Sequence, residues 1–231
     1  MAGKAIAIRT VKGATTCYTY HISNTLVMTK ALTCTIPLTR TFQSVSIIPY
    51  TEYHGRRHYF MCIDAIHREI TGPGGCREKG ETFIDTATRE LDEETIGLFS
   101  FRSAEEKAHI YNNSVSLFNQ DTLLIFQRVG VANPLSICQT YQYRYWQARH
   151  VGAPSHYLEN LALIWISEDD LRSIVCTGRS EPVAMPPELG GLIRSPHTAH
   201  NPKAYTNMYP PLYSRLRAIL VIAYTGTTTL L

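Results

Sequence analysis

Three glutamates, Glu90, Glu93 and Glu94, are the residues whose types and spacing best suit chemistry in this sequence. On a helix, with about 100° between successive residues, they fall within one arc of roughly 100°, whereas Asp92 points away. Carboxylates crowded on one helix face repel each other, and a bound hard cation relieves that repulsion. Oxygen ligands in this number suit Mg²⁺ or Mn²⁺, which also bridge to phosphate oxygens. The alternative interpretation is a solvated amphipathic helix with an acidic face.

The helix that must position these glutamates is marked at both ends. The glycine turn Pro73-Gly74-Gly75 precedes it, and Asp85 lies near its start, where a carboxylate suits the positive end of the helix dipole. Gly97 lies just past its end, as expected of a residue that stops a helix in the left-handed conformation. An adjoining arc predicts a stripe that packs on a sheet, and it consists of Ile84, Thr88, Leu91 and Thr95.

The spacing of these residues resembles the Nudix box, GX5EX7REUXEEXGU, in which U is an aliphatic residue. The residues that fall on its positions are Gly75, Glu81, Arg89, Glu90, Leu91, Glu93 and Glu94. This set at fixed spacing favours the box over a merely acidic helix. In one place the sequence departs from the box, because the family has one residue between the last glutamate and the glycine. Here Thr95 and Ile96 stand there, and we expect the extra residue to shift the helix end by one position.

The resemblance implies an enzyme that hydrolyses the diphosphate bond of a nucleoside diphosphate linked to another group, with Mg²⁺ or Mn²⁺ as cofactor. Carried over to this sequence, it implies that Glu90, Glu93 and Glu94 bind the metal, together with the Gly75 carbonyl. It also implies that Glu90 or Glu93 orients or deprotonates the attacking water. Arg89 and Glu81 would pair to hold the helix against the preceding loop, which completes the catalytic set Glu90, Glu93, Arg89 and Glu81.

The substrate stays open between a free nucleotide, a nucleotide sugar, a dinucleotide polyphosphate and the 5′ cap of an mRNA. The formal net charge of +3 argues against a large RNA footprint. A further alternative is a Nudix module that senses a nucleotide without hydrolysing it. Three acids outside the box are candidates for a catalytic base by position, although such residues are more often surface acids or helix caps: Glu159, Glu168 and Asp169.

Composition gives broad limits. The 231 residues are 44% hydrophobic and 18% charged, which predicts a sizeable core and excludes a disordered tail. The six cysteines show no CxxC or zinc-type spacing, so we expect reduced thiols. No segment approaches the length of a membrane span and the start lacks a long apolar run. We therefore expect a cytoplasmic protein, with the nucleus as the alternative, and no membrane partner; the oligomeric state stays open.

The order of the expected elements predicts an α+β fold of αβα layers, with a mixed β-sheet between the box helix and a C-terminal helix. This Nudix-like domain should span residues 42–224, after a β-rich extension at 1–41 and before a tail at 225–231. A hairpin is expected from Lys4–Val11 and Cys17–Ile22. The other expected strands are 42–50, 57–66, 109–118, 123–129 and 161–166, and the later helices are 168–175 and 212–224.

Two long insertions, at about 130–160 and 176–209, are expected to be loops. The first interleaves aromatic and cationic side chains over Tyr141–His150, which suits stacking on a base and contacting phosphate. The alternative is that these aromatics pack onto the domain. The candidate substrate-binding residues are Arg144, Tyr145, Trp146 and Arg149. In the second insertion, His197 and His200 have no third ligand nearby and do not predict a zinc site.

Overall fold

The computed structural model describes residues 6–11, 14–18, 42–118, 121–177, 183–193 and 208–225. In this part of the chain, nine strands form one mixed sheet, with the order β2-β1-β7-β8-β3-β4-β5; β6 pairs with β3, and β9 with β4. The strands are β1 (Ile6–Val11), β2 (Ala14–Tyr18), β3 (Ser44–Tyr53), β4 (Arg56–Asp64), β5 (Ile70–Thr71), β6 (Gly74–Cys76), β7 (Val115–Phe118), β8 (Thr122–Arg128) and β9 (Asn160–Ser167). The helices are α1 (Phe83–Glu94), α2 (Ala104–Asn113), α3 (Pro134–His150), the 3₁₀ helix η1 (Ser155–Leu158), α4 (Glu168–Thr177), α5 (Pro187–Ile193) and α6 (Ser214–Thr225).

The sheet is arranged around β3. Along one edge, β3 pairs in parallel with β8; along the other, it pairs antiparallel with β6 at its start and with β4 at its end. The turn between β3 and β4 is His54-Gly55, and both residues have positive φ, as a two-residue hairpin turn requires. This turn joins the two strands predicted at 42–50 and 57–66. The pairing with β6 brings the glycines of Pro73–Gly75 onto the sheet as a short strand.

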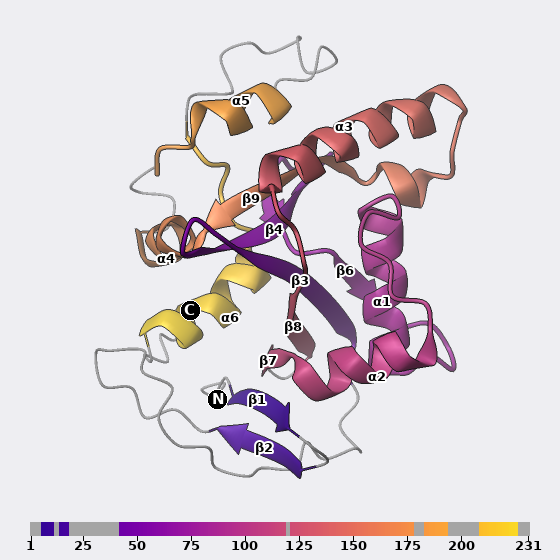
Figure 1. Cartoon of the computed structure of the whole chain (residues 1–231), viewed down its shortest axis with the longest axis vertical. Coiled ribbons are helices and arrows are strands. Elements are labelled where there is room, and N and C mark those ends of the chain that lie inside the picture. Colours follow the sequence, from indigo (N-terminus) through magenta and orange to yellow (C-terminus); the bar gives the residue numbers. More distant parts are fainter. Residues whose placement is uncertain are drawn as a thin grey trace.

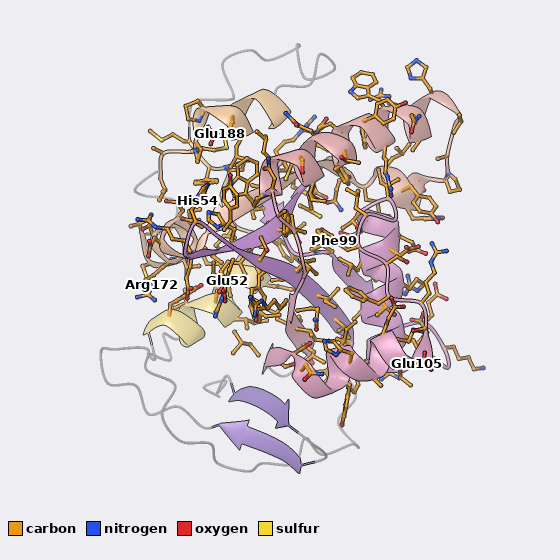
Figure 2. All side chains as sticks on the ribbon, viewed as in Figure 1. Glu52, His54, Phe99, Glu105, Arg172 and Glu188 are labelled. Atoms are coloured by element: carbon orange, nitrogen blue, oxygen red, sulfur yellow. The ribbon has the colours of Figure 1, made fainter. Side chains whose placement is uncertain are left out.

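Helices cover both faces of the sheet (Figure 1): α1, α2 and α3 lie on one side, and α4 and α6 on the other. The predicted α+β class and the mixed sheet between the box helix and the last helix are confirmed. Between the first layer and the sheet, the ring of Phe99 lies 5.1 Å from that of Phe60, and Figure 2 labels Phe99 beside α1. On the opposite side, α6 buries three apolar residues at helical spacing, Leu216, Ile219 and Leu220.

The predicted N-terminal hairpin is present as β1 and β2, although its second strand is Ala14–Tyr18 rather than Cys17–Ile22. Residues 19–41 lie outside the described part of the chain. Because β1 also pairs antiparallel with β7, the hairpin of β1 and β2 continues the main sheet.

The strand expected at His109–Phe118 is wrong in its first half, because residues up to Asn113 belong to α2. Ser103 caps this helix: its hydroxyl accepts from the Glu106 amide, and the Glu106 carboxylate accepts from the Ser103 amide. This capping box starts the helix that includes His109–Asn113. Only Val115–Phe118 forms a strand, β7.

The loop expected at about 130–160 is also wrong, because 17 of its residues form α3. Asn133 caps the helix through its side chain, which accepts from the Leu135 amide, and Pro134 occupies the first turn. Cys138, Tyr141 and Tyr145 are buried from this helix against the sheet. The segment is therefore part of the core, in agreement with the alternative that its aromatics pack onto the domain.

The predicted strand at 161–166 and the following helix are confirmed as β9 and α4. The Ser167 hydroxyl caps α4 by accepting from the Asp170 amide at 3.1 Å. Of the second insertion, the structure describes α5 and a bridge between Ala184 and Met208, whereas His197 and His200 lie outside the described residues. Residues 226–231 of the expected tail also lie outside them. Among the described helices, none is long and apolar enough to cross a membrane.

Candidate active site

The start of α1 is fixed by a capping box. The Thr82 hydroxyl accepts from the Asp85 amide, and the Asp85 carboxylate accepts from the Thr82 amide at 3.2 Å. Lys107 of α2 places its ammonium 2.7 Å from Asp85 Oδ1. The bonds from Lys107 and Thr82 lower the pKa of Asp85 to about 2. The first turn of α1 is thus tied to α2 and to the loop before it.

Arg89 and Glu81 form the pair that the family resemblance implied. Arg89 Nε donates to Glu81 Oε1 at 2.8 Å and Nη2 donates to Oε2 at 3.2 Å, so the contact is bidentate. The bonds from Arg89 lower the pKa of Glu81 to about 2. Arg89 also reaches the β6 backbone, since Nη2 lies 3.3 Å from the Cys76 carbonyl oxygen. These bonds join α1 to the loop and to β6.

The same guanidinium lies between two of the three glutamates. Arg89 Nη1 donates to Glu90 Oε1 at 2.8 Å and to Glu93 Oε2 at 3.2 Å. Burial raises the pKa of Glu90, repulsion from Glu93 and Glu159 adds to the rise, and Arg89 opposes it. Glu90 lies directly over β6, where a Cβ at Gly75 would be 2.4 Å from Glu90 Oε1. Only glycine leaves room for that carboxylate.

Glu94 is held differently, by neutral donors in the core. It is 7% exposed; Oε1 accepts from the Gly74 amide at 3.3 Å and Oε2 accepts from Asn160 Nδ2 at 2.7 Å. Burial raises the pKa of Glu94 to about 8, and repulsion from Glu90 and Glu159 adds to the rise. A nearby cation would favour its ionised form.

The end of α1 corrects the expectation about the extra residue. Thr95 is the C-cap, and Ile96 already has a left-handed φ of 52°, so the helix end is not shifted. The Ile96 amide donates to Glu93 O and the Gly97 amide to Asp92 O, the bond pattern of a Schellman motif. Ile96 therefore stands at the left-handed position that the box gives to glycine. For an L-residue this conformation costs roughly 1–2 kcal/mol.

Arg144 of α3 supports this strained end. Its Nη1 donates to the Ile96 carbonyl oxygen at 2.8 Å. Arg144 thus binds backbone at the end of α1 rather than reaching toward the three glutamates. Tyr145 is 6% exposed and stacks near Tyr141, so its ring is not available to a substrate, and that assignment is wrong. Trp146 is half-buried beside His150, and Arg149 is exposed.

Of the three candidate bases, one lies near the glutamates. Glu159 is exposed, and its charge raises the pKa of both Glu90 and Glu94. Glu168 and Asp169 follow the other end of β9, whose eight residues span roughly 23 Å at about 3.3 Å per residue. Asp169 lies 3.8 Å from Arg56 instead.

The donor set suits a hard cation by its chemistry, because Glu90, Glu93 and Glu94 supply several carboxylate oxygens from one helix. Within the described ranges, however, no three or more His, Cys, Asp or Glu side chains are grouped as metal ligands are. The reason lies in their partners, because Arg89 binds Glu90 and Glu93 while Glu94 turns to Gly74 and Asn160. Arg89 contacts only one oxygen of each of its two glutamates, Oε1 of Glu90 and Oε2 of Glu93, so the second oxygen of each remains for a cation.

Asn160 is the residue that the sequence analysis missed. It is 3% exposed, and its amide contacts a box glutamate from a strand 66 residues further along the chain. The available signal was a polar residue directly before the apolar run Leu161–Ile166. A buried amide needs a hydrogen-bond partner, so a polar residue at this position indicates a polar partner in the core.

No family model matches the chain, and no curated protein matches its sequence. Solved structures do match. An Ap4A hydrolase from C. elegans, in a binary complex, is 15% identical over 67% of this chain and 93% of its own, with a TM-score of 0.34. A Nudix hydrolase from M. smegmatis, RenU, is 13% identical over 58% and 74%, with a TM-score of 0.33. A Nudix hydrolase from Nitrosomonas europaea is 16% identical over 72% and 92%, with a TM-score of 0.31. Two of these three carry the name of the family whose box this sequence resembles.

Proposed function

We propose that this chain is a Nudix-type hydrolase, dependent on Mg²⁺ or Mn²⁺, that cleaves the diphosphate bond of a nucleoside diphosphate linked to another group. One observation supports this most strongly: α1 places Glu90 over Gly75 of β6 and Glu94 within hydrogen-bond reach of the Gly74 amide, while Glu93 shares Arg89 with Glu90. Arg89 and Glu81 lock the helix to that strand. An acidic helix face that served only solubility would not need this buried support.

Each residue has a defined task in this proposal. Glu90, Glu93 and Glu94, with the Gly75 carbonyl, hold the divalent cation, which neutralises charge on phosphate oxygens and acidifies water. Glu81 holds Arg89 bidentately, and Arg89 keeps α1 in register with β6. Gly75 leaves the space in which the Glu90 carboxylate lies. Gly74 donates its amide to Glu94 and so fixes one of its oxygens.

A base must accept the proton of the attacking water. Glu90 and Glu93 are the candidates within the box. Glu159 is the candidate outside it, because it is exposed and lies near Glu90 and Glu94, whereas Glu168 and Asp169 lie at the far end of β9. Replacing Glu159 by Gln would lower turnover about 100-fold if it is the base. The corresponding change at Glu168 should leave turnover unchanged.

The alternative of a module that only senses a nucleotide loses its support here. Such a module would be favoured by a box helix whose end is displaced by the extra residue before Gly97, and the end of α1 is in place. The substrate is proposed to be a small nucleotide compound rather than capped RNA, because the net charge of +3 gives little attraction for a long polyanion.

A substrate panel tests the function and the substrate class together. The purified chain would be incubated with nucleotide sugars, dinucleotide polyphosphates, nucleoside triphosphates and capped RNA, each with excess Mg²⁺ or Mn²⁺ and with a chelator. We expect cleavage of a small diphosphate compound that the chelator abolishes. Raising the salt to about 0.2 M should change it little, whereas RNA cleavage would fall steeply. Intact substrates throughout the panel would contradict the proposal.

A further inference from the structure

We propose that Asn160 is a positioning residue for Glu94, and that a β-bulge in β9, stabilised by α3, points its amide at that carboxylate. The inference rests on the proposed function, in which Glu94 is a metal ligand. It concerns how the chain orients the Glu94 carboxylate before any metal binds.

The bulge is visible in the pairing of β9 with β4. Ala162 lies opposite Ile63, but Asn160 lies opposite Asp64, so Leu161 is an extra residue on β9. A bulge of this kind interrupts the alternation of side chains between the two faces of a sheet. Bulges are frequent beside functional sites because they re-aim a side chain.

The direction of Asn160 follows from the neighbouring residues. Phe60 and Cys62 face the α1 and α3 layer, since Phe60 contacts Phe99 and the Glu94 charge acts on Cys62. Their partners across the strands, Trp165 and Leu163, share that face. Strict alternation would put Asn160 on the opposite face, beside α4 and α6. The bulge returns it to the α1 face, where Nδ2 lies 2.7 Å from Glu94 Oε2.

Helix α3 satisfies the carbonyls at the bulge. The buried Tyr141 hydroxyl donates to the Asn160 carbonyl at 2.7 Å, and Gln142 Nε2 donates to the Leu161 carbonyl at 3.3 Å. Buried backbone carbonyls need such partners, and leaving one without costs about 1–3 kcal/mol. The helix thus stabilises the irregular backbone that orients Asn160.

The chemistry of the donor explains why an amide is suitable. Gly74 and Asn160 each donate to one Glu94 oxygen, which fixes the carboxylate without neutralising it. A carboxylate offers about four acceptor sites, so each oxygen keeps one for a cation. An arginine or lysine at position 160 would fix Glu94 equally well but would compete with the metal for its charge.

The experiment compares Mn²⁺ binding by the whole chain and its variants, read from the electron paramagnetic resonance signal of free Mn²⁺. Asn160→Ala should weaken Mn²⁺ binding about 10- to 100-fold, the usual effect of removing a partner of a metal ligand. The Mn²⁺ concentration for half-maximal hydrolysis should rise by the same factor, while turnover at saturating Mn²⁺ stays within a few-fold of the original.

Gln127→Ala is the matched control. Gln127 is also a 3% exposed amide with two hydrogen bonds, to Ser114 and to the Arg128 carbonyl, but it lies on β8. Its loss should lower the melting temperature without changing the Mn²⁺ affinity. Tyr141→Phe, which keeps the ring and removes only the hydroxyl, should weaken Mn²⁺ binding several-fold.

The outcomes separate this inference from the proposed function. If the unmodified chain binds no Mn²⁺ and cleaves no diphosphate, the proposed function fails and this inference fails with it. If the unmodified chain binds Mn²⁺ and folded Asn160→Ala binds it equally well, this inference alone is overturned. Should Asn160→Ala not fold, Tyr141→Phe decides: weakened Mn²⁺ binding supports the inference, and unchanged binding overturns it.

Discussion

Gly74 and Gly75 are adjacent, yet a side chain at each would meet a different obstacle. At Gly74, a Cβ would lie 2.4 Å from the Val45 carbonyl oxygen and 2.5 Å from the Ser46 Cα, which are both backbone atoms of β3. At Gly75, a Cβ would meet the Glu90 carboxylate, the end of a flexible side chain. Gly74 is therefore needed for the pairing of β6 with β3, and Gly75 for the observed position of Glu90, a proposed metal ligand.

Exchanging each glycine for alanine should separate these two roles. Gly75→Ala should keep the melting temperature within a few degrees, because Glu90 moves aside, and should lower diphosphate turnover about tenfold or more. Gly74→Ala should cost more than about 2 kcal/mol of unfolding free energy, because β6 must move away from β3. Thermal melts and turnover measured on both variants check this. Full activity in Gly75→Ala would show that the observed place of Glu90 does not matter.

At the scale of elements, the contact between α1 and α2 includes one ion pair with a clear pH dependence, beside the ring contact of Phe83 with Tyr111. Asp85 has a folded-state pKa of about 2 against an ordinary value of 3.8. Its pKa is lowered on folding, so its contribution to stability is complete above about pH 4 and is lost as the pH falls toward about 2. The pair is partly exposed, with side chains 31% and 39% accessible, so solvent screening keeps the contribution small.

Replacing Asp85 by Ala should therefore lower the unfolding free energy by about 1 kcal/mol near neutral pH. The difference from the original protein should shrink as the pH approaches about 2. Urea unfolding of both proteins, near neutral pH and at about pH 2, measures this difference in unfolding free energy. Asp169→Ala is the control, since Asp169 is 76% exposed and 3.8 Å from Arg56. A destabilisation by Asp85→Ala that is equal at both pH values would rule out the ion pair as its cause.

The sequence predicted α1 because its signals are local. Thr82, Asp85 and the box glutamates lie within one stretch, and each acts on its neighbours. α2 was missed although Ser103 and Glu106 form the same kind of capping box. α3 was missed for another reason, because no regular apolar pattern marks it as a helix. The residues that it buries, Cys138, Tyr141 and Tyr145, are small or amphipathic, and their burial depends on the packing of the helix on β9. Asn160 could not be placed at all, because a bulge depends on the register of two strands.

At the scale of the whole molecule, the N-terminal strands β1 and β2 are part of the main sheet. β1 pairs with β7 over Ile6–Arg9 and Val115–Phe118, so β7 is an interior strand only while β1 is present. Unpaired edge strands promote association between chains. The strand order of the sheet brings together segments that are far apart in the sequence. A sequence pattern alone predicts where strands lie but not which strands pair.

Removing residues 1–41 should expose the edge of β7 and cause concentration-dependent association, measured by light scattering. Adding Ser116→Lys to the shortened chain should reduce the association, because a charged side chain protects an edge strand. Mn²⁺ binding should persist in both, since α1, β6 and β9 are intact. A shortened chain that scatters like the full one at every concentration would contradict this role of β1.

The most direct measurement is the turnover of Glu93→Gln beside that of Asp92→Asn. The two acids are adjacent on α1 and equally accessible, at 22% and 21%, and each contacts an arginine, Arg89 or Arg102. Only Glu93 belongs to the proposed metal-binding face. With excess Mg²⁺ and the best diphosphate substrate, Glu93→Gln should lower turnover about 100-fold or more, while Asp92→Asn stays near the original. Equal turnover in Glu93→Gln and the unmodified protein would contradict the proposed mechanism.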